Sequence, residues 1–406
     1  MFDFTLSEEQ RALRTLVREF VEREVKPRVA SLDAEPDPVK GVPWEIIKAA
    51  NQVGLRNLAM RKDLGGGEMD CVTLGMCVEE LGVGDLGVSV VFAQNWKITQ
   101  MLQYKATEEQ IRKFLIPLRE DPVGLMAVGY TEPESGSDFI VPCLDPKGGM
   151  KLSSFGDGNY AVLNGTKQFI SNGFIAHLYI ISTRSNKEVP FTQGMTTFIV
   201  PRDLPGVPNL PGFTLGRVYD KIGERLAGNA ELIFENCRVP LDNMLGEWHK
   251  AYEQVVPGFR MSNAYAGAST LGVGWAALER ALEYTKVRIQ GAMPIIQHAN
   301  IAIQLADMYT NLKAAQLMVR KGCWQADHME SYDPLLARSI KPFCSEVTMK
   351  VALEALKMHG GNGAMKDVGM EKLVRDAIMF LHSDGLNDSL HRGTGNLLAT
   401  TPFSRD

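Results

Sequence analysis

The sequence Val128-Gly-Tyr-Thr-Glu-Pro-Glu-Ser-Gly-Ser-Asp138 best indicates how this 406-residue chain is organised. It continues an apolar run that begins at Val123, so the pattern predicts a buried strand that ends in a loop. Pro, Gly and Ser favour turns, and such a loop leaves backbone N–H groups free to bind a ligand. A flat, polar ring system would suit this loop. An ordinary surface turn of the same composition is the alternative.

Composition narrows the classes of protein and of partner. The chain is 45% hydrophobic and 22% charged, which is typical of a soluble globular protein of two or three domains. The formal net charge of the chain is −5 and its pI is about 5.9. The sequence contains no block rich in Lys or Arg. We therefore expect neither a nucleic acid nor a membrane as a partner. Small-molecule chemistry is the better expectation.

The cysteines and the start of the chain indicate a compartment. The six cysteines are scattered without metal-ligand spacing, so we expect reduced packing residues and no metal site. No apolar run reaches the ~20 residues that span a bilayer. The first ten residues are acidic and lead straight into a helical pattern, so no targeting leader is expected. We expect a cytoplasmic protein.

The periodicity of apolar residues changes twice along the chain. It predicts an α+β fold with an N-terminal helical domain (1–122), a middle β-barrel or β-sandwich domain (123–247) and a C-terminal four-helix bundle (248–406). A capping box from Ser7 to Gln10 opens the first helix, and Pro27 is expected to end it. The other helices expected are 44–53, 71–81, 107–117, 261–288, 301–324 and 334–358.

Tyr130-Thr131-Glu132-Pro133, followed by Ser135-Gly136-Ser137-Asp138, resembles the flavin-contacting signature of the acyl-CoA dehydrogenase family. The resemblance extends over essentially the whole chain, with its motifs in the family's order. It implies an FAD-dependent oxidoreductase with the helical, β and helical domains described above. The cofactor contacts that it implies in this stretch are Val128, Tyr130, Thr131, Gly136 and Ser137.

A second motif follows in the β domain. Residues 164–167 (Asn-Gly-Thr-Lys) are predicted to form a turn that leads into Gln168-Phe-Ile-Ser-Asn-Gly173. The family resemblance implies that Phe169 lies beside the isoalloxazine ring and that Ser171 donates a hydrogen bond at the flavin N5 edge. A plain hairpin with Phe169 in its core is the alternative.

Residues near the C-terminal helices are similar to those that hold the flavin pyrophosphate. By resemblance, Arg288 reaches the pyrophosphate across a dimer interface, which suits the bidentate hydrogen bonding of Arg. Gly360 and Gly361 let backbone amides approach the cofactor, and Lys357 stands where the family usually has Gln. A homodimer or homotetramer is implied. A solvated Arg and a simple helix stop at the glycines are the alternatives.

Arg375-Asp376-Ala377 and the acidic residue Asp384 resemble the family's catalytic C-terminal segment. In that chemistry a carboxylate takes the α proton of a thioester while hydride leaves the β carbon for flavin N5. Most members have Glu at this place, followed by Gly-Thr, whereas here Asp384 precedes Gly385-Leu386. Asp is one methylene shorter, so the substrate must lie closer or the backbone must shift. A turn residue before glycine is the alternative.

The family's Asp-x-x-Arg pair, which contacts coenzyme A and steers the base, falls here on Arg260 and Asn263, and neither type is retained. An Asp base with a Ser in this helix is similar to the nitroalkane oxidases of the same superfamily. By this resemblance Ser262 could hydrogen-bond Asp384, and Arg392 could balance its charge.

Three functions remain open. The first is an acyl-CoA dehydrogenase of fatty acid metabolism that acts on a branched, cyclic or otherwise unusual acyl group, with electron-transfer flavoprotein or another acceptor as partner. The second is a flavoprotein oxidase similar to nitroalkane oxidase, with oxygen as acceptor. The third is a non-catalytic scaffold with the family fold, for which the missing Glu is the argument.

Overall fold

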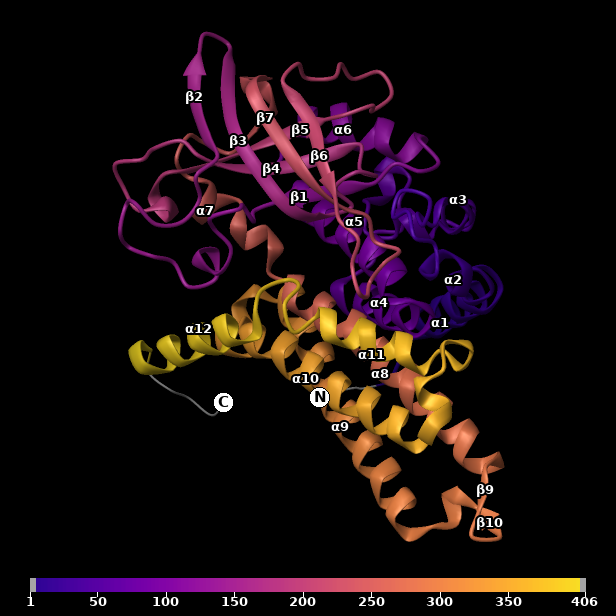
Figure 1. Ribbon diagram of the computed structural model, residues 1–406. Helices are drawn as coiled ribbons and strands as arrows, with labels where there is room; N and C mark the ends of the chain where they lie inside the picture. Colours follow the sequence, from indigo (N-terminus) through magenta and orange to yellow (C-terminus); the bar gives the residue numbers. More distant parts are fainter. Residues whose placement is uncertain (1–4, 402–406) are drawn as a thin grey trace.

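The computed structural model describes residues 5–401, and residues 1–4, where the expected leaderless N-terminus begins, lie outside that range. Helices of both halves of the chain gather below a β-sheet formed by its middle (Figure 1). The helices α8 (Ser262–Val287) and α9 (Ala299–Asp327) continue downward and are joined by the small hairpin of β9 (Ile289–Gln290) and β10 (Met293–Pro294), far from the sheet (Figure 1). The predicted order of helical, β and helical parts is confirmed.

The first helix, α1 (Glu8–Phe20), starts as predicted. Ser7 Oγ accepts the N–H of Gln10 at 3.1 Å, and the Gln10 side chain accepts the N–H of Ser7 at 3.1 Å, which completes the capping box. The predicted stop at Pro27 is wrong. A π-helical turn (Val21–Val25) connects α1 to α2 (Lys26–Asp33), and Pro27 lies in the first turn of α2, where a helix needs no N–H donor.

The apolar pattern of the sequence does not predict α5, a helix of the N-terminal part. It is buried on nearly every side, so it lacks the alternation of apolar and polar faces that reveals a surface helix. The helix α6 also continues three residues beyond Pro117, its predicted end. The helices of this part after α2 are α3 (Trp44–Gln52), α4 (Cys71–Gly84), α5 (Leu86–Lys105) and α6 (Glu108–Glu120).

Eight strands form one mixed sheet in the order β6-β7-β3-β2-β4-β5-β8, with β1 parallel to β4. The predicted turn at 164–167 is wrong, because these residues lie inside β3. In place of a turn, the pairing of β3 with β7 shifts register at a bulge beside Gly165, whose φ of 137° suits glycine. The strands are β1 (Met126–Gly129), β2 (Ser153–Asp157), β3 (Tyr160–Ser171), β4 (Leu178–Arg184), β5 (Met195–Pro201), β6 (Phe213–Val218), β7 (Asn229–Pro240) and β8 (Met244–Leu245).

The C-terminal helices pack around α8, and α4 of the N-terminal part packs on α8 as well. The close approach of α4 and α8 depends on Gly82 and Gly272, whose backbones meet where a side chain would not fit. Helices from both ends of the chain therefore share one hydrophobic core. The elements are α7 (Ala251–Gln254), α8 (Ser262–Val287), β9 (Ile289–Gln290), β10 (Met293–Pro294), α9 (Ala299–Asp327), α10 (Pro334–Met358), α11 (Met370–Met379) and α12 (Asn387–Thr400).

Within residues 5–401, none of the helices is both long and apolar enough to cross a membrane. The same part of the chain contains no group of three or more His, Cys, Asp or Glu side chains that could hold a metal ion.

Candidate active site

The loop after β1 is fixed to β3 by a buried ion pair. Lys167 Nζ lies 2.6 Å from Glu132 Oε1 and donates to the Tyr130 carbonyl at 3.0 Å. The N–H of Gln168 donates to the Thr131 carbonyl at 2.9 Å. Burial lowers the pKa of Lys167, and the neighbouring Glu132 opposes that shift. The loop and β3, predicted separately as cofactor contacts, are thus held side by side.

Phe169 is presented to solvent by the backbone. A second bulge in β3 gives it a φ of 57°, a conformation that is rare for a bulky residue and is found often at functional sites. The side chain is 55% exposed and packs against Tyr219, with ring centroids 4.7 Å apart. The alternative of a core Phe169 is wrong. Ser171, two residues further along β3, is half-buried.

Tyr130 does not present its ring at this surface. The ring stacks on Phe139 with centroids 4.3 Å apart and meets Phe259 edge-on, and burial raises the pKa of Tyr130. Only the backbone of Tyr130 can therefore take part in the expected contact. The other predicted contacts of this stretch remain accessible: Val128 and Thr131 are half-buried, and Gly136 and Ser137 are exposed.

Asp384 lies in a tight turn between α11 and α12. Its φ is 50° and that of Gly385 is 99°, so two successive residues have left-handed backbone. Buried Lys341 of α10 fixes the turn, because its Nζ donates to the Gly385 carbonyl at 2.5 Å and to Asn387 Oδ1 at 2.8 Å. A Cβ added at Gly385 would lie 2.5 Å from Ile140 Cδ1, so the turn touches the segment that follows Ser137.

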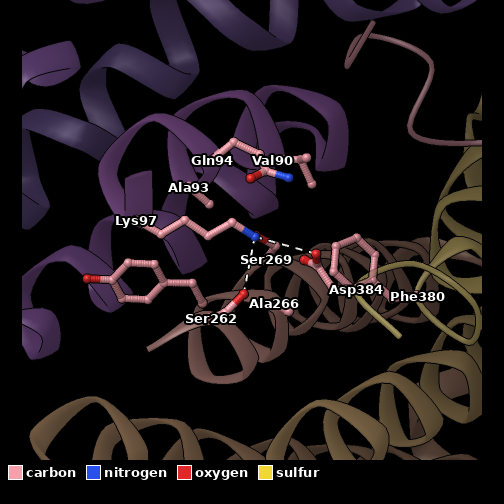
Figure 2. Close-up of a pocket in the computed structure, with 10 residues that line it drawn as sticks. Val90, Ala93, Gln94, Lys97, Ser262, Ala266, Ser269, Phe380 and Asp384 are labelled. Atoms are coloured by element: carbon pink, nitrogen blue, oxygen red, sulfur yellow. Dashed lines mark hydrogen bonds and ion pairs between the residues drawn. The ribbon is translucent and has the colours of Figure 1, made fainter. Parts of the chain in front are cut away.

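The Asp384 carboxylate lines a cavity between α5, α8 and the end of α11 (Figure 2). Lys97 of α5 reaches into it, with Nζ 3.4 Å from Asp384 Oδ1 and 3.2 Å from Ser262 Oγ. The Asp384 side chain is 29% exposed, whereas that of Lys97 is only 5% exposed. Asp384 therefore borders a small, partly open cavity that both polar and apolar side chains line. Sequence reasoning missed Lys97, although a lone lysine in an otherwise apolar run was the available signal.

Two predicted partners of Asp384 are replaced by Lys97. Ser262 does not hydrogen-bond Asp384, because the ammonium of Lys97 lies between them and binds both (Figure 2). Arg392 is exposed on α12, and the ion pair with Asp384 is made by Lys97 instead. Arg260 turns away to α9, where its Nε donates to the Ala326 carbonyl, and Asn263 is half-buried.

The triplet 375–377 anchors the segment that carries Asp384. Arg375 pairs with Asp33 of α2 at 2.6 Å and donates to the Ile222 carbonyl at 2.8 Å. Asp376 accepts the N–H of Glu224 at 2.8 Å. It also pairs with Lys372, which in turn binds Asp85 at the start of α5. The triplet thus connects α11 to both the β part and the N-terminal helices.

The remaining predicted cofactor residues gather at the far end of the bundle. Tyr284, one turn before Arg288, stacks on His359 with ring centroids 4.3 Å apart and accepts a hydrogen bond from Asn362. A Cβ at Gly360 or Gly361 would meet nothing within 4 Å, so the backbone there is open. Lys357 is exposed and pairs with Glu354 at 2.7 Å. Arg288 is exposed at the end of α8.

These two regions fit the two ends of a long flavin cofactor. The exposed Phe169 lies beside the loop after β1 that contains Thr131, here called the Thr131 loop, and offers a surface for a planar ring. Gly360 and Gly361, near Arg288, leave open backbone that suits a pyrophosphate. Figure 1 shows that the sheet and the far end of the bundle are widely separated. One chain alone therefore does not bring the two regions together. The fold and these sites define a flavin-dependent oxidoreductase.

Comparison with known proteins specifies the family. The models of the acyl-CoA dehydrogenase N-terminal, middle and C-terminal domains match residues 7–121, 127–237 and 253–393. A probable acyl-CoA dehydrogenase of Bacillus subtilis is 32% identical, over 95% of this chain and 97% of the relative. A cyclohex-1-ene-1-carbonyl-CoA dehydrogenase of Syntrophus aciditrophicus is 29% identical, over 97% of this chain and 90% of the relative.

Among solved structures, butyryl-CoA dehydrogenase from Megasphaera elsdenii is similar to this chain at 30% identity. The TM-score is 0.87, with 98% of this chain and 100% of the other covered. The chain belongs to the acyl-CoA dehydrogenase family. It is an FAD-dependent oxidoreductase that acts on CH–CH groups.

Proposed function

We propose that this protein is an acyl-CoA dehydrogenase in which Asp384 takes the α proton of the acyl thioester. The observation that carries the proposal is the position of the Asp384 carboxylate. It lines a cavity between α5 and α8, and its turn touches the segment that leads from the Thr131 loop. A base must be within reach of the proton that it removes, and geometry is the first criterion for such a residue.

The reaction removes one proton and one hydride from adjacent carbons and leaves a carbon–carbon double bond. Bound FAD supplies the acceptor for the hydride of the β carbon. Asp384 holds the proton on a carboxylate oxygen. The direction of that carboxylate is fixed by Lys97 and by the turn at Gly385, which Lys341 binds. A misplacement of about 1 Å can reduce the rate by roughly a hundredfold, so these supports bear directly on activity.

We further propose that the acyl group is branched, cyclic or otherwise unusual. The left-handed turn at Asp384 and Gly385 sets how far the carboxylate reaches into the cavity. Similarity to two cyclohex-1-ene-1-carbonyl-CoA dehydrogenases, at 29% and 28% identity, agrees with an unusual acyl group for this chain as well.

A homodimer or dimer of dimers would complete the cofactor site. The Thr131 and Phe169 surface and the Arg288 and Gly360 region lie far apart within one chain, so a second copy must supply one of them to each FAD. We further propose electron-transfer flavoprotein as the acceptor that reoxidises the flavin, as the family resemblance implies.

A panel of substrates tests this function. Purified holoenzyme is mixed without oxygen with acyl-CoA thioesters of straight, branched and cyclic chains, and bleaching of the flavin near ~450 nm is followed. We expect bleaching with at least one thioester. Nitroalkanes are included as the second class, because Asp replaces Glu as in the nitroalkane oxidases. Bleaching by nitroalkanes alone, with fast reoxidation by oxygen, would establish the oxidase instead.

A further inference from the structure

The cavity beside Asp384 contains a polar atom without a partner. The side chain of Gln94 on α5 is 6% exposed and lines the cavity, and its Oε1 has no hydrogen-bond donor among the described residues. A buried acceptor without a donor costs roughly 1–3 kcal/mol, so such an atom calls for an explanation. Figure 2 shows the Gln94 amide above the ammonium of Lys97.

The other polar groups around the cavity already have partners. Ser269 Oγ accepts from Ser89 Oγ at 3.0 Å, and the Tyr265 hydroxyl donates to Gln100 Oε1 at 2.9 Å. Lys97 uses two N–H groups on Asp384 and Ser262, and an ammonium has three. One donor of Lys97 and one acceptor of Gln94 therefore remain for a ligand.

The size and the charge of the cavity limit what can bind there. Its volume of about 10 Å³ is that of a single water-sized group. An alkyl group would satisfy neither polar atom. A carboxylate can only accept and would leave Gln94 Oε1 without a donor, and an ammonium would be repelled by Lys97. The hydroxyl group of a ligand, like a water molecule, both donates and accepts, so it can bind Gln94 and Lys97 at once.

We propose that the acyl group of the substrate is short and carries a hydroxyl beyond its reacting carbons, and that Gln94 and Lys97 bind this hydroxyl. The inference rests on the proposed function, because it directs only the hydroxyl end of the acyl chain into the small cavity beside Asp384. Gln94 selects the substrate without taking part in the chemistry. Lys97 both binds the hydroxyl and positions the base.

Two thioesters of similar shape test the proposal. In 4-hydroxybutyryl-CoA a hydroxyl occupies the place of the terminal methyl of pentanoyl-CoA. A site built to hydrogen-bond a hydroxyl strongly rejects an analogue that lacks it. With wild-type holoenzyme we expect the second-order rate constant of flavin reduction to be at least about tenfold higher for the hydroxylated thioester. Calorimetric titration should give a dissociation constant that favours the same thioester.

Variants of Gln94 locate the effect. Gln94→Leu removes the acceptor at similar size and should abolish the preference in both rate and affinity, whereas Gln94→Glu keeps an acceptor and should retain most of it. Each variant is compared with itself on the two thioesters, so general damage to the fold cancels in the ratio.

The outcomes distinguish a failure of the hydroxyl inference from a failure of the proposed function. If wild type prefers pentanoyl-CoA or does not discriminate, the hydroxyl inference is overturned and the dehydrogenase function stands. If Gln94→Leu keeps the preference for the hydroxyl, the assignment to this cavity is overturned. If no acyl-CoA of any kind reduces the flavin, the proposed function itself fails.

Discussion

Asp384 and Lys97 are 287 residues apart in the chain, yet they form the ion pair at the centre of the site. Lys97 has buried surroundings and two acceptors, Asp384 and Ser262, so it orients the carboxylate more firmly than solvent could. The sequence drew attention to Asp384 and Ser262. A lone lysine in an apolar run marks Lys97 as unusual, but nothing local to α5 shows that it lies close to the C-terminal turn.

Removing the carboxylate at position 384 should abolish proton abstraction. In Asp384→Asn we expect the rate of substrate-dependent flavin bleaching to fall by about 10²–10⁴-fold, because an amide is not a base. The protein should remain yellow, since no predicted FAD contact is changed. Stopped-flow absorbance gives the rate, and Asp388→Asn, an exposed acid on α12, is the matched control. Full bleaching by Asp384→Asn would mean that the base lies elsewhere.

Lys341 should give stability a pH dependence. Burial lowers its pKa from 10.5 to about 8, although Asp384 opposes the shift. Between these values the unfolded chain binds a proton that the folded chain lacks, so this group makes the folded state more stable as pH rises. The free energy of unfolding of wild type should therefore increase relative to Lys341→Met by up to about 3 kcal/mol across that window.

Urea unfolding at several pH values from 8 to 10.5 measures this difference. Lys341→Met also loses the hydrogen bonds to Gly385 and Asn387, which lowers stability at every pH, so only the slope of the difference is diagnostic. A difference that stays constant over the window would contradict the lowered pKa.

At the scale of elements, the approach of α4 to α8 decides where the cavity lies. A Cβ at Gly272 would be 2.4 Å from the Glu79 carbonyl oxygen and 2.6 Å from the backbone of Gly82. Backbone atoms cannot move aside as a flexible side chain can. These glycines therefore set the spacing of the two helices, and α5 follows α4 directly into the active site.

Gly272→Ala should push α4 away from α8. We expect a loss of about 1–3 kcal/mol of stability from overpacking, measured by urea unfolding. Gly395→Ala in α12 is the matched control, because a Cβ there meets nothing within 4 Å. It should stabilise the protein by about 0.5–1 kcal/mol through helix propensity. Equal effects of the two substitutions would show that the contact does not set the helix spacing.

At the scale of the whole molecule, the sheet strand β3, which carries Phe169, and the end of α8 near the β9–β10 hairpin, where Arg288 lies, are well apart (Figure 1). Contacts of the triplet 375–377 connect the helical and β parts of one chain. They do not bring the predicted ring surface close to the predicted pyrophosphate region. The separation is the reason to expect an oligomer with shared cofactor sites. The domain boundaries at 122 and 247 stay a prediction.

Arg288→Met should weaken FAD binding. Loss of a charge-assisted hydrogen bond costs about 1.5–3 kcal/mol, which corresponds to about a 10- to 150-fold higher dissociation constant. Fluorescence titration of the apoprotein with FAD measures it, and Lys286→Met, an exposed cation two residues earlier, is the control. Light scattering should give the mass of a dimer or tetramer. A monomer that binds FAD tightly would contradict the shared site.

By itself the sequence determined the class of fold and the family resemblance from which the cofactor-contacting segments are predicted. The periodicity of apolar residues depends on local backbone geometry. Motifs such as 130–138 and 375–384 can be recognised from consecutive residues alone. Only the tertiary structure decided which side chains converge. It replaced Ser262 and Arg392 by Lys97 as the partner of Asp384, revealed the unpaired oxygen of Gln94, and separated Phe169 from Arg288. The physical reason is that such contacts depend on helix packing across hundreds of residues, which no local pattern records.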